Sequence, residues 1–162
     1  MIRGTSPYPR VQTTIALRDA WAEWLDLLDK KLGWDWYVTL TFANDRKAPE
    51  AADKAYRLFI HKLNRAVYGV RYTRRGEGVW WVRATEHHRY RDVIHYHALI
   101  GGVFNVRRLT WMDVWSNEMG EGWARIQPYD RRRGARYYLA KYIAKGGEID
   151  LYIPRQRRLR LG

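Results

Sequence analysis

Two histidines separated by one residue are the part of this sequence best suited to metal chemistry. They are His95 and His97, and the apolar residues around them favour a β-strand over 93–100. Because side chains alternate across a strand, both imidazoles point to one face, about 6–7 Å apart along the strand, while Tyr96 points to the other. Two imidazoles at this spacing can bind a single divalent ion.

A second group of reactive side chains follows in residues 136–145, which the pattern predicts to be helical. Tyr138, Lys141, Tyr142 and Lys145 occupy positions i, i+3, i+4 and i+7 and share one helix face. The opposite face is apolar, so we expect the tyrosines and lysines to face out of the core. A phenol is a weak nucleophile because its ordinary pKa is about 10. Nearby lysines would favour the phenolate, and a metal ion would polarise an attacked phosphate.

A two-histidine metal site needs a third ligand, and Glu86 is the best candidate. If 79–86 and 93–100 form a hairpin centred near residues 89–90, His95 lies opposite Ala84, and Glu86 is diagonal to His95 on the same face. A register change of one residue would turn Glu86 away. His88 is a rival ligand, and Asp92 is a weaker one. Two imidazoles and one carboxylate suit Mn²⁺ or Mg²⁺ with positions left for phosphate oxygens.

The composition points to a polyanionic partner. The 162 residues carry 30 Lys and Arg against 17 Asp and Glu, a net charge of +13. There are no cysteines, which excludes disulfides, thiol catalysis and cysteine zinc sites. We find no apolar run long enough for a membrane span and no signal peptide, so we expect a cytoplasmic protein with no membrane partner.

The length suits one domain over 1–162, with a flexible basic arm at 1–12 and a mobile basic tail at 155–162. Hydrophobic spacing predicts four helices and four strands. In the helix at 107–119 the apolar positions are Leu109, Met112 and Trp115. We expect an α+β fold with a central antiparallel sheet of about five strands flanked by helices. The predicted helices are 13–32, 49–67, 107–119 and 136–145, and the predicted strands are 36–42, 79–86, 93–100 and 122–129.

Three segments resemble, in order, the motifs of the HUH endonucleases, and specifically of the rolling-circle replication initiators (Rep proteins). Residues 38–42, Val-Thr-Leu-Thr-Phe, look like the first strand motif. His95-Tyr96-His97 looks like the His-hydrophobic-His metal motif, with a more polar middle residue. Residues 138–145 resemble the two-tyrosine motif of initiators from small single-stranded DNA phages and related plasmids.

The resemblance implies a ferredoxin- or RRM-like sheet that carries the metal site, with the tyrosine helix packed beside it. It implies nicking and rejoining of single-stranded origin DNA, including a hairpin form, through a 5′-phosphotyrosine that frees a 3′-OH. A host helicase and polymerase would be partners. Both Tyr138 and Tyr142 satisfy the one-tyrosine form of the motif, and we favour Tyr138 for the first nick, with Tyr142 available for a second transfer. Tyr137 is rotated off this face and should be dispensable.

Basic segments are expected to bind DNA without sequence preference. Two other functions fit the residues: an HUH transposase with the same chemistry, and a non-catalytic single-stranded nucleic-acid module that stacks bases on Trp36, Trp80 and Trp81. The chain lacks a Walker A motif, so we expect no helicase module within it. The candidate DNA-binding residues are Arg71, Arg74, Arg75, Arg131, Arg132 and Arg133, together with the 155–160 tail.

Overall fold

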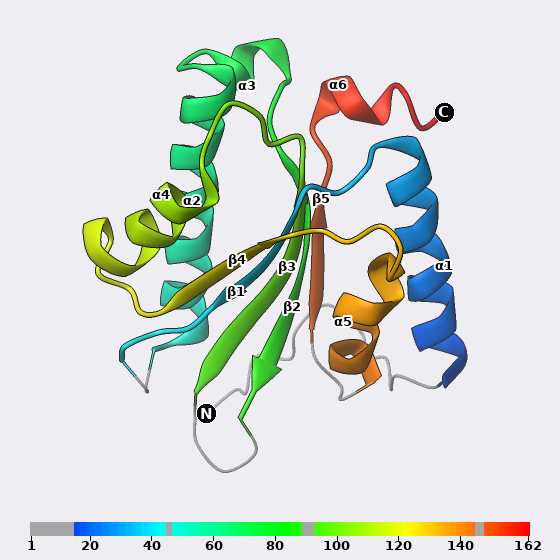
Figure 1. Ribbon diagram of the computed structural model, residues 1–162, viewed down its shortest axis with the longest axis horizontal. Helices are drawn as coiled ribbons and strands as arrows, with labels where there is room; N and C mark the ends of the chain where they lie inside the picture. The colour runs from blue at the N-terminus through cyan, green and yellow to red at the C-terminus, as the bar shows by residue number, and fades with distance from the viewer. Residues whose placement is uncertain (1–14, 45–46, 89–92, 145–147) are drawn as a thin grey trace, which may run out of the picture.

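The chain folds into three layers, with a β-sheet between two layers of helices (Figure 1). The computed structural model describes residues 15–44, 47–88, 93–144 and 148–162, except the side chains of 15–18, 141, 143 and 144. The helices are α1 (Ile15–Lys31), α2 (Pro49–Tyr68), α3 (Tyr72–Arg75), α4 (Arg108–Asp113), the π-helical turn η1 (Val114–Glu118), α5 (Gly134–Ala144) and α6 (Arg155–Arg158). The strands are β1 (Trp36–Leu40), β2 (Trp80–His87), β3 (Ile94–Gly101), β4 (Ala124–Pro128) and β5 (Ile149–Tyr152).

The five strands form one antiparallel sheet in the order β4-β1-β3-β2-β5. The first four strands, with α2 between β1 and β2 and α4 between β3 and β4, have the β-α-β-β-α-β order of a ferredoxin-like unit. Helix α1 precedes this unit, and α5 and β5 follow it. The α+β fold with a five-stranded antiparallel sheet is therefore confirmed.

Helices α2 and α4 cover one face of the sheet. Pro49 occupies the first turn of α2, where its missing N–H costs no hydrogen bond. The helix then buries residues at helical spacing, among them Tyr56, Phe59 and Leu63. These side chains pack on Val38 and Leu40, which alternate with partly exposed residues along β1. Even-numbered positions of β1 therefore face α2, and its odd-numbered positions face the other layer.

Helices α1 and α5 pack on the opposite face of the sheet, over β2 and β3. Leu25 and Leu28 of α1 join Leu139 of α5 in a second core with Val82 and Leu99. This second core packs α5 against both α1 and the sheet. Residues on the sheet-facing side of α5 are therefore buried even where they carry a polar atom.

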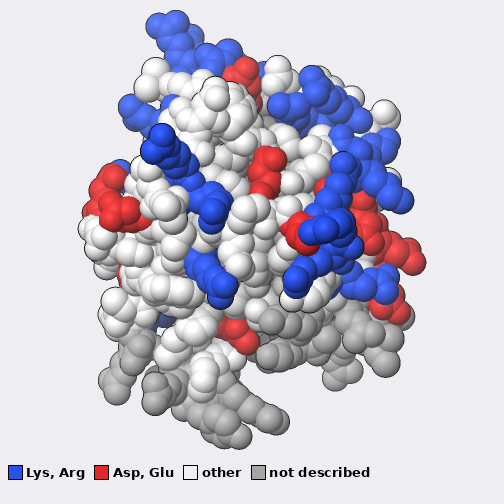
Figure 2. Space-filling model, viewed as in Figure 1, with Lys and Arg blue, Asp and Glu red and all other residues white. Residues whose placement is uncertain are grey.

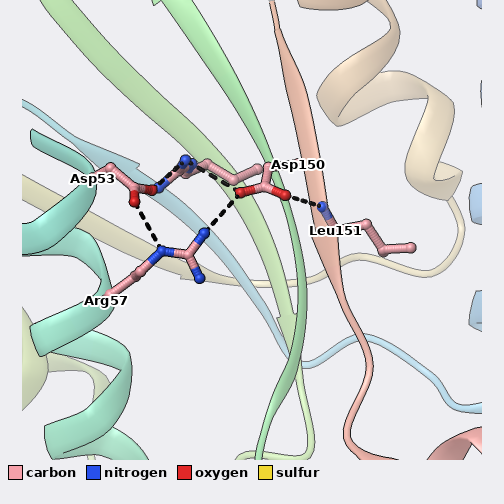
Figure 3. A network of polar contacts seen from close by, with 5 residues as sticks. Asp53, Arg57, Asp150 and Leu151 are labelled. Carbon is pink, nitrogen blue, oxygen red and sulfur yellow. Dashed lines mark hydrogen bonds and ion pairs between the residues drawn. The ribbon is translucent and has the colours of Figure 1, made fainter. Parts of the chain in front are cut away.

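A buried arginine connects three elements on the α2 side of the sheet (Figure 3). Arg83 of β2 pairs with Asp53 of α2 at 2.8 Å and lies 3.5 Å from Asp150 of β5. Arg57 also pairs with both carboxylates, at 2.8 and 3.3 Å. Burial opposes the charge on Asp53, but hydrogen bonds from Arg57 and Arg83 hold the pKa of this carboxyl below its ordinary value. The network attaches β5 to the sheet in addition to the β2–β5 ladder.

The C-terminal segment differs most from expectation. Residues 149–152 were not predicted as a strand, yet they pair with β2 as β5. The expected mobile tail instead contains α6, whose Gln156 N–H donates to the Gly76 carbonyl at 3.0 Å. The Arg157 guanidinium lies 5.0 Å from the Trp80 ring centre. These contacts pack the C-terminal segment against the domain, because each one joins it to a residue near the start of β2.

Two further segments depart from the predicted pattern. Residues 72–75, which lie outside the predicted helices and strands, form the short helix α3, which ends at Gly76 in the left-handed conformation. The predicted helix at 107–119 exists as α4 followed by η1, but Leu109 is 69% exposed. The residues that this segment buries are Trp111, Val114 and Trp115, which pack on the α2 side of the sheet.

Candidate functional site

Strands β2 and β3 bring His95, His97 and Glu86 to one face of the sheet. Glu86 lies directly opposite His95, and Ala84 lies opposite His97. The hairpin is thus shifted by two residues from the predicted pairing, in which Ala84 faced His95. A two-residue shift leaves every side chain on its predicted face. Glu86 therefore lies beside both histidines, as expected, but it is diagonal to His97 and not to His95.

The His97 ring is held at both nitrogens. Its Nε2 lies 2.8 Å from Glu86 Oε2. Its Nδ1 lies 3.3 Å from the Tyr37 hydroxyl and 3.3 Å from Thr39 Oγ1. A hydroxyl can donate or accept, so these partners suit Nδ1 with or without a proton. The 2.8 Å contact with the acceptor-only carboxylate of Glu86 places a proton on Nε2, which donates to Glu86. A metal ion bound at Nε2 would replace this proton, and Nδ1–H would then donate to a hydroxyl as the outer hydrogen-bond partner of a metal-ligating histidine.

Tyr142 of α5 stacks directly on His97. The two ring centres are 3.8 Å apart and the planes differ by 9°. The Tyr142 hydroxyl lies 3.5 Å from the Tyr37 hydroxyl. Burial raises the pKa of Tyr142, a hydrogen bond from Tyr37 lowers it, and the nearby Glu86 charge raises it, with a net upward shift. Of the tyrosines on α5, Tyr142 is therefore the one that the fold places beside the histidine and carboxylate pair.

Tyr138, one turn earlier on α5, has a different hydroxyl partner. Its oxygen accepts a hydrogen bond from the Asp130 backbone N–H at 2.9 Å. Its ring packs at 4.7 Å from Tyr37 and 5.2 Å from Tyr129. The hydroxyl of Tyr138 is thus hydrogen-bonded to the turn that precedes α5. The geometry therefore favours Tyr142 over Tyr138 as the tyrosine of the candidate site.

The expectation that the tyrosine face of α5 points away from the core is wrong. Tyr138 and Tyr142 are 7% and 5% exposed, because α5 packs against both α1 and the sheet. Tyr137, which was expected off the face, is the exposed tyrosine at 57%. The side chain of Lys141 and all of Lys145 lie outside the described residues, so their expected role stays a prediction.

The donor set suits a divalent metal ion in part. One carboxylate and two imidazoles share a face, and Nδ1 of His97 has hydroxyl partners that could orient its ring. Glu86 and His97 contact each other directly, however, and no group of three His, Cys, Asp or Glu side chains with metal-holding geometry occurs in the described part of the chain. The rival ligand His88 follows β2 and is exposed, and Asp92 lies outside the described residues.

The candidate DNA-binding arginines form two groups, one at α3 and one in the turn before α5. Arg71, Arg74 and Arg75 are exposed at α3, which precedes the start of β2. Glu86 lies near the other end of β2, six residues or about 20 Å from Trp80, so the α3 group is distant from the site. Figure 2 shows basic side chains gathered at the end of the molecule where α3 and α6 lie. Arg131, Arg132 and Arg133 occupy the turn before α5.

Several of these arginines are paired with carboxylates. Arg75 contacts Glu77 at 2.6 Å, and Arg131 lies 3.8 Å from Asp29. Asp130 lies 3.2 Å from Arg132 and 3.6 Å from Arg133, and hydrogen bonds from Arg132 lower the pKa of its carboxyl. Such exposed pairs are weak and can be exchanged for phosphate contacts.

Sequence reasoning missed two residues of the site, Tyr37 and Thr39. The signal was present, because residues 36–42 alternate and odd positions of β1 share a face. What the sequence lacked was the β1–β3 register, which places Thr39 opposite His97.

The tryptophans proposed as a base-stacking surface cannot serve that role. Trp36, Trp80 and Trp81 are 6%, 5% and 2% exposed. Trp36 and Trp81 belong to the core under α2, and Trp80 belongs to the core under α1. The non-catalytic binding module built on these three residues is therefore contradicted by their burial.

One protein family matches the greater part of the chain. The family model of the ORF2-type replication-associated proteins matches residues 35–147, which include β1, the two histidines and α5. No curated protein matches the chain, and no solved structure matches it. None of the helices in the described part of the chain combines the length and apolar character needed to span a bilayer.

Proposed function

The chain belongs to the family of ORF2-type replication-associated proteins, and we propose that it nicks and rejoins single-stranded DNA at a replication origin. Family membership indicates a role in replication initiation. The observation that carries the proposed chemistry is the stack of Tyr142 on His97, with Glu86 at 2.8 Å from the same imidazole. A potential nucleophile, an imidazole and a carboxylate thus meet on one sheet face.

The reaction is a transesterification at phosphorus. The Tyr142 oxygen attacks the phosphate and forms a bond to phosphorus, while the bond from phosphorus to the 3′ oxygen breaks. The phenol loses one proton and the departing 3′ oxygen gains one, so the step needs no oxidant and no nucleotide. The DNA 5′ end stays on the tyrosine, and the free 3′-OH can be extended by a host polymerase with a host helicase. The reverse reaction rejoins strands.

Four side chains around Tyr142 would hold the metal ion and position the nucleophile. Glu86, His95 and His97 would hold Mn²⁺ or Mg²⁺, with Glu86 turning from His97 to the ion. The bound ion would polarise the attacked phosphate. Tyr37 contacts both the His97 ring and the Tyr142 hydroxyl, and so positions the nucleophile against the imidazole.

The test is formation of a covalent protein–DNA adduct. The native protein is incubated with a pool of labelled single-stranded oligonucleotides and Mn²⁺, and adducts are separated by denaturing electrophoresis. We expect an adduct that disappears in chelator and in the variants His95→Ala and His97→Ala, which should keep most of their DNA affinity because phosphate contacts elsewhere supply it. An adduct that survives thorough chelation would refute the metal requirement, and the absence of any adduct across the pool would refute the nicking activity.

A further inference from the structure

The sheet face that carries the candidate site is covered over only part of its width. On β2 and β3 this face is buried under α1 and α5, as shown by Val82 and Leu99, both fully buried. On β1 and β4 the same face is partly open. Thr39, Arg125 and Gln127 lie on this face within the strands, and Thr41 and Trp123 pair just beyond the strand ends; we call these five residues the β1–β4 strip.

The register makes this strip continuous with the site. Thr39 lies between His97 on β3 and Arg125 on β4 in one row of the sheet. Trp123 lies next to Thr41, whose backbone N–H donates to the Trp123 carbonyl at 2.9 Å. Neighbouring strands are about 4.8 Å apart, so Arg125 begins about 10 Å from His97 across the sheet.

Trp123 is an exposed aromatic ring in a chain that buries six of its nine tryptophans. It is 55% exposed, the largest value among the nine tryptophans, all of which are described. Trp24, at 36%, is the next most exposed. A large exposed ring beside a polar site is typical of a surface on which bases stack.

The backbone that carries Trp123 is firmly held. Thr41 Oγ1 donates to the Trp123 carbonyl at 3.2 Å and accepts from the Trp123 N–H at 3.0 Å. The preceding residue is Gly122, where a Cβ would come within 2.4 Å of the Thr41 carbonyl oxygen. This close approach requires glycine, and it fixes the strand end before any ligand binds.

Arg125 supplies a charge that no described residue neutralises. It is exposed, and it has no ion-pair or hydrogen-bond partner among the described residues. By contrast, Arg75, Arg131, Arg132 and Arg133 each face a carboxylate. A guanidinium that is unpaired among the described residues and lies near the proposed nicking site is complementary to a phosphate of the same strand.

We propose that the β1–β4 strip binds the single-stranded DNA adjoining the cleaved phosphate, with Trp123 stacking on a base and Arg125 contacting a backbone phosphate. The inference rests on the proposed function for the identity of the strand. It adds a binding surface to the site made by Tyr142, His97 and Glu86, and it makes single-stranded DNA the preferred ligand, because paired bases in a duplex do not offer a free face to Trp123.

Binding can be tested apart from cleavage. The full chain is titrated with a fluorescent random-sequence single-stranded 20-mer in chelator, using anisotropy at several salt concentrations. We expect Trp123→Ala to lose about 5- to 150-fold in affinity, the equivalent of one base stack, and Trp123→Phe to recover part of it. Arg125→Gln should lower the slope of log affinity against log salt by about 0.7.

Two matched variants serve as controls. Trp24→Ala removes an exposed tryptophan from α1, and Arg65→Gln removes an exposed arginine from α2, on the far side of the sheet. Both should bind the 20-mer like the native protein. Thermal melts of all variants exclude unfolding as the cause of a loss.

The outcomes separate this inference from the proposed function. Native affinity and an unchanged salt slope in folded Trp123→Ala and Arg125→Gln would refute DNA binding by the β1–β4 strip, even if the native protein forms an adduct. An equal loss in Trp24→Ala would overturn it as well. A loss of DNA affinity confined to the Trp123 and Arg125 variants supports DNA binding by the strip, even if no adduct forms with any metal. In that case only the proposed nicking activity is refuted.

Discussion

Replacing each α5 tyrosine by phenylalanine should separate stability from chemistry. The change keeps the ring and removes only the hydroxyl. Tyr138→Phe leaves the Asp130 N–H without its 2.9 Å acceptor at a partly buried position. We expect a loss of about 1–2 kcal/mol in unfolding free energy. For a chain of this length that corresponds to a fall of about 2–8 °C in Tm.

Tyr142→Phe should have the opposite profile. The phenylalanine ring can keep the stack on His97, and the hydroxyl bond to Tyr37 is long at 3.5 Å, so the Tm should fall less than in Tyr138→Phe. The adduct with labelled DNA should disappear, because the attacking oxygen is gone. Tyr137→Phe is the matched control, since its side chain is 57% exposed, and it should change neither Tm nor adduct.

The measurements are thermal melts and adduct yield with Mn²⁺, made on the same preparations. If Tyr142→Phe still forms adduct while Tyr138→Phe does not, the reasoning from hydroxyl partners is refuted and Tyr138 is the nucleophile. If each single variant forms adduct and only the double variant fails, both tyrosines are competent. Adduct in the double variant would move the chemistry to another residue, with Tyr137 the next to examine.

Changes at the Asp53–Arg83 pair, at Gly122 and in the C-terminal segment test the rest of the fold. Asp53→Ala should lower the free energy of unfolding by about 2 kcal/mol, less than for a fully buried ion pair because Asp53 is partly exposed. Arg83→Met should lower it less, since this change removes the buried charge itself. Urea unfolding measures both values. Because the pKa of Asp53 is lowered on folding, its contribution is present above about pH 4 and is lost as pH falls through the folded value, so Asp53→Ala should flatten the acid limb of stability against pH. Gly122→Ala should lower both Tm and affinity for single-stranded DNA, because the added Cβ meets the Thr41 carbonyl oxygen; unchanged values would show that β4 can shift freely. Deleting residues 155–162 should lower Tm, through lost α6 contacts, as well as the salt slope of DNA binding; an unchanged Tm would show that these contacts contribute nothing.

The faces of the central strands could be predicted from the sequence because alternation is a local property. His95, His97 and Glu86 share a face in the structure even though the hairpin pairs two residues away from the predicted register. An even shift preserves the side of every residue, so the site survives this error. An odd shift would have removed Glu86 from the site.

Long-range contacts account for what the sequence did not predict. Strand β5 is short and lies at the sheet edge, and it pairs with β2 as part of a set of contacts that includes the Thr85 N–H on the Glu148 carbonyl and the ion pairs of Asp150. None of these partners lies near β5 in the sequence. Similarly, Arg157 looks like a residue of a free basic tail until its contact with Trp80 is known.

The two tyrosines of α5 show how far a spacing argument reaches. Residues four apart share a helix face, but they are displaced along the axis by about 6 Å. In this chain that displacement carries the two hydroxyls to different partners: Tyr138 reaches the Asp130 N–H, and Tyr142 reaches Tyr37 beside His97. Because α5 is packed against both α1 and the sheet, Tyr138 could act at the same phosphate only if its hydroxyl left Asp130 and either α5 or the DNA moved by about one helical turn. The i, i+4 spacing therefore predicts a shared face but not equal access to one phosphate. Equal access would require this movement, and adduct formation by both Tyr138→Phe and Tyr142→Phe would reveal it.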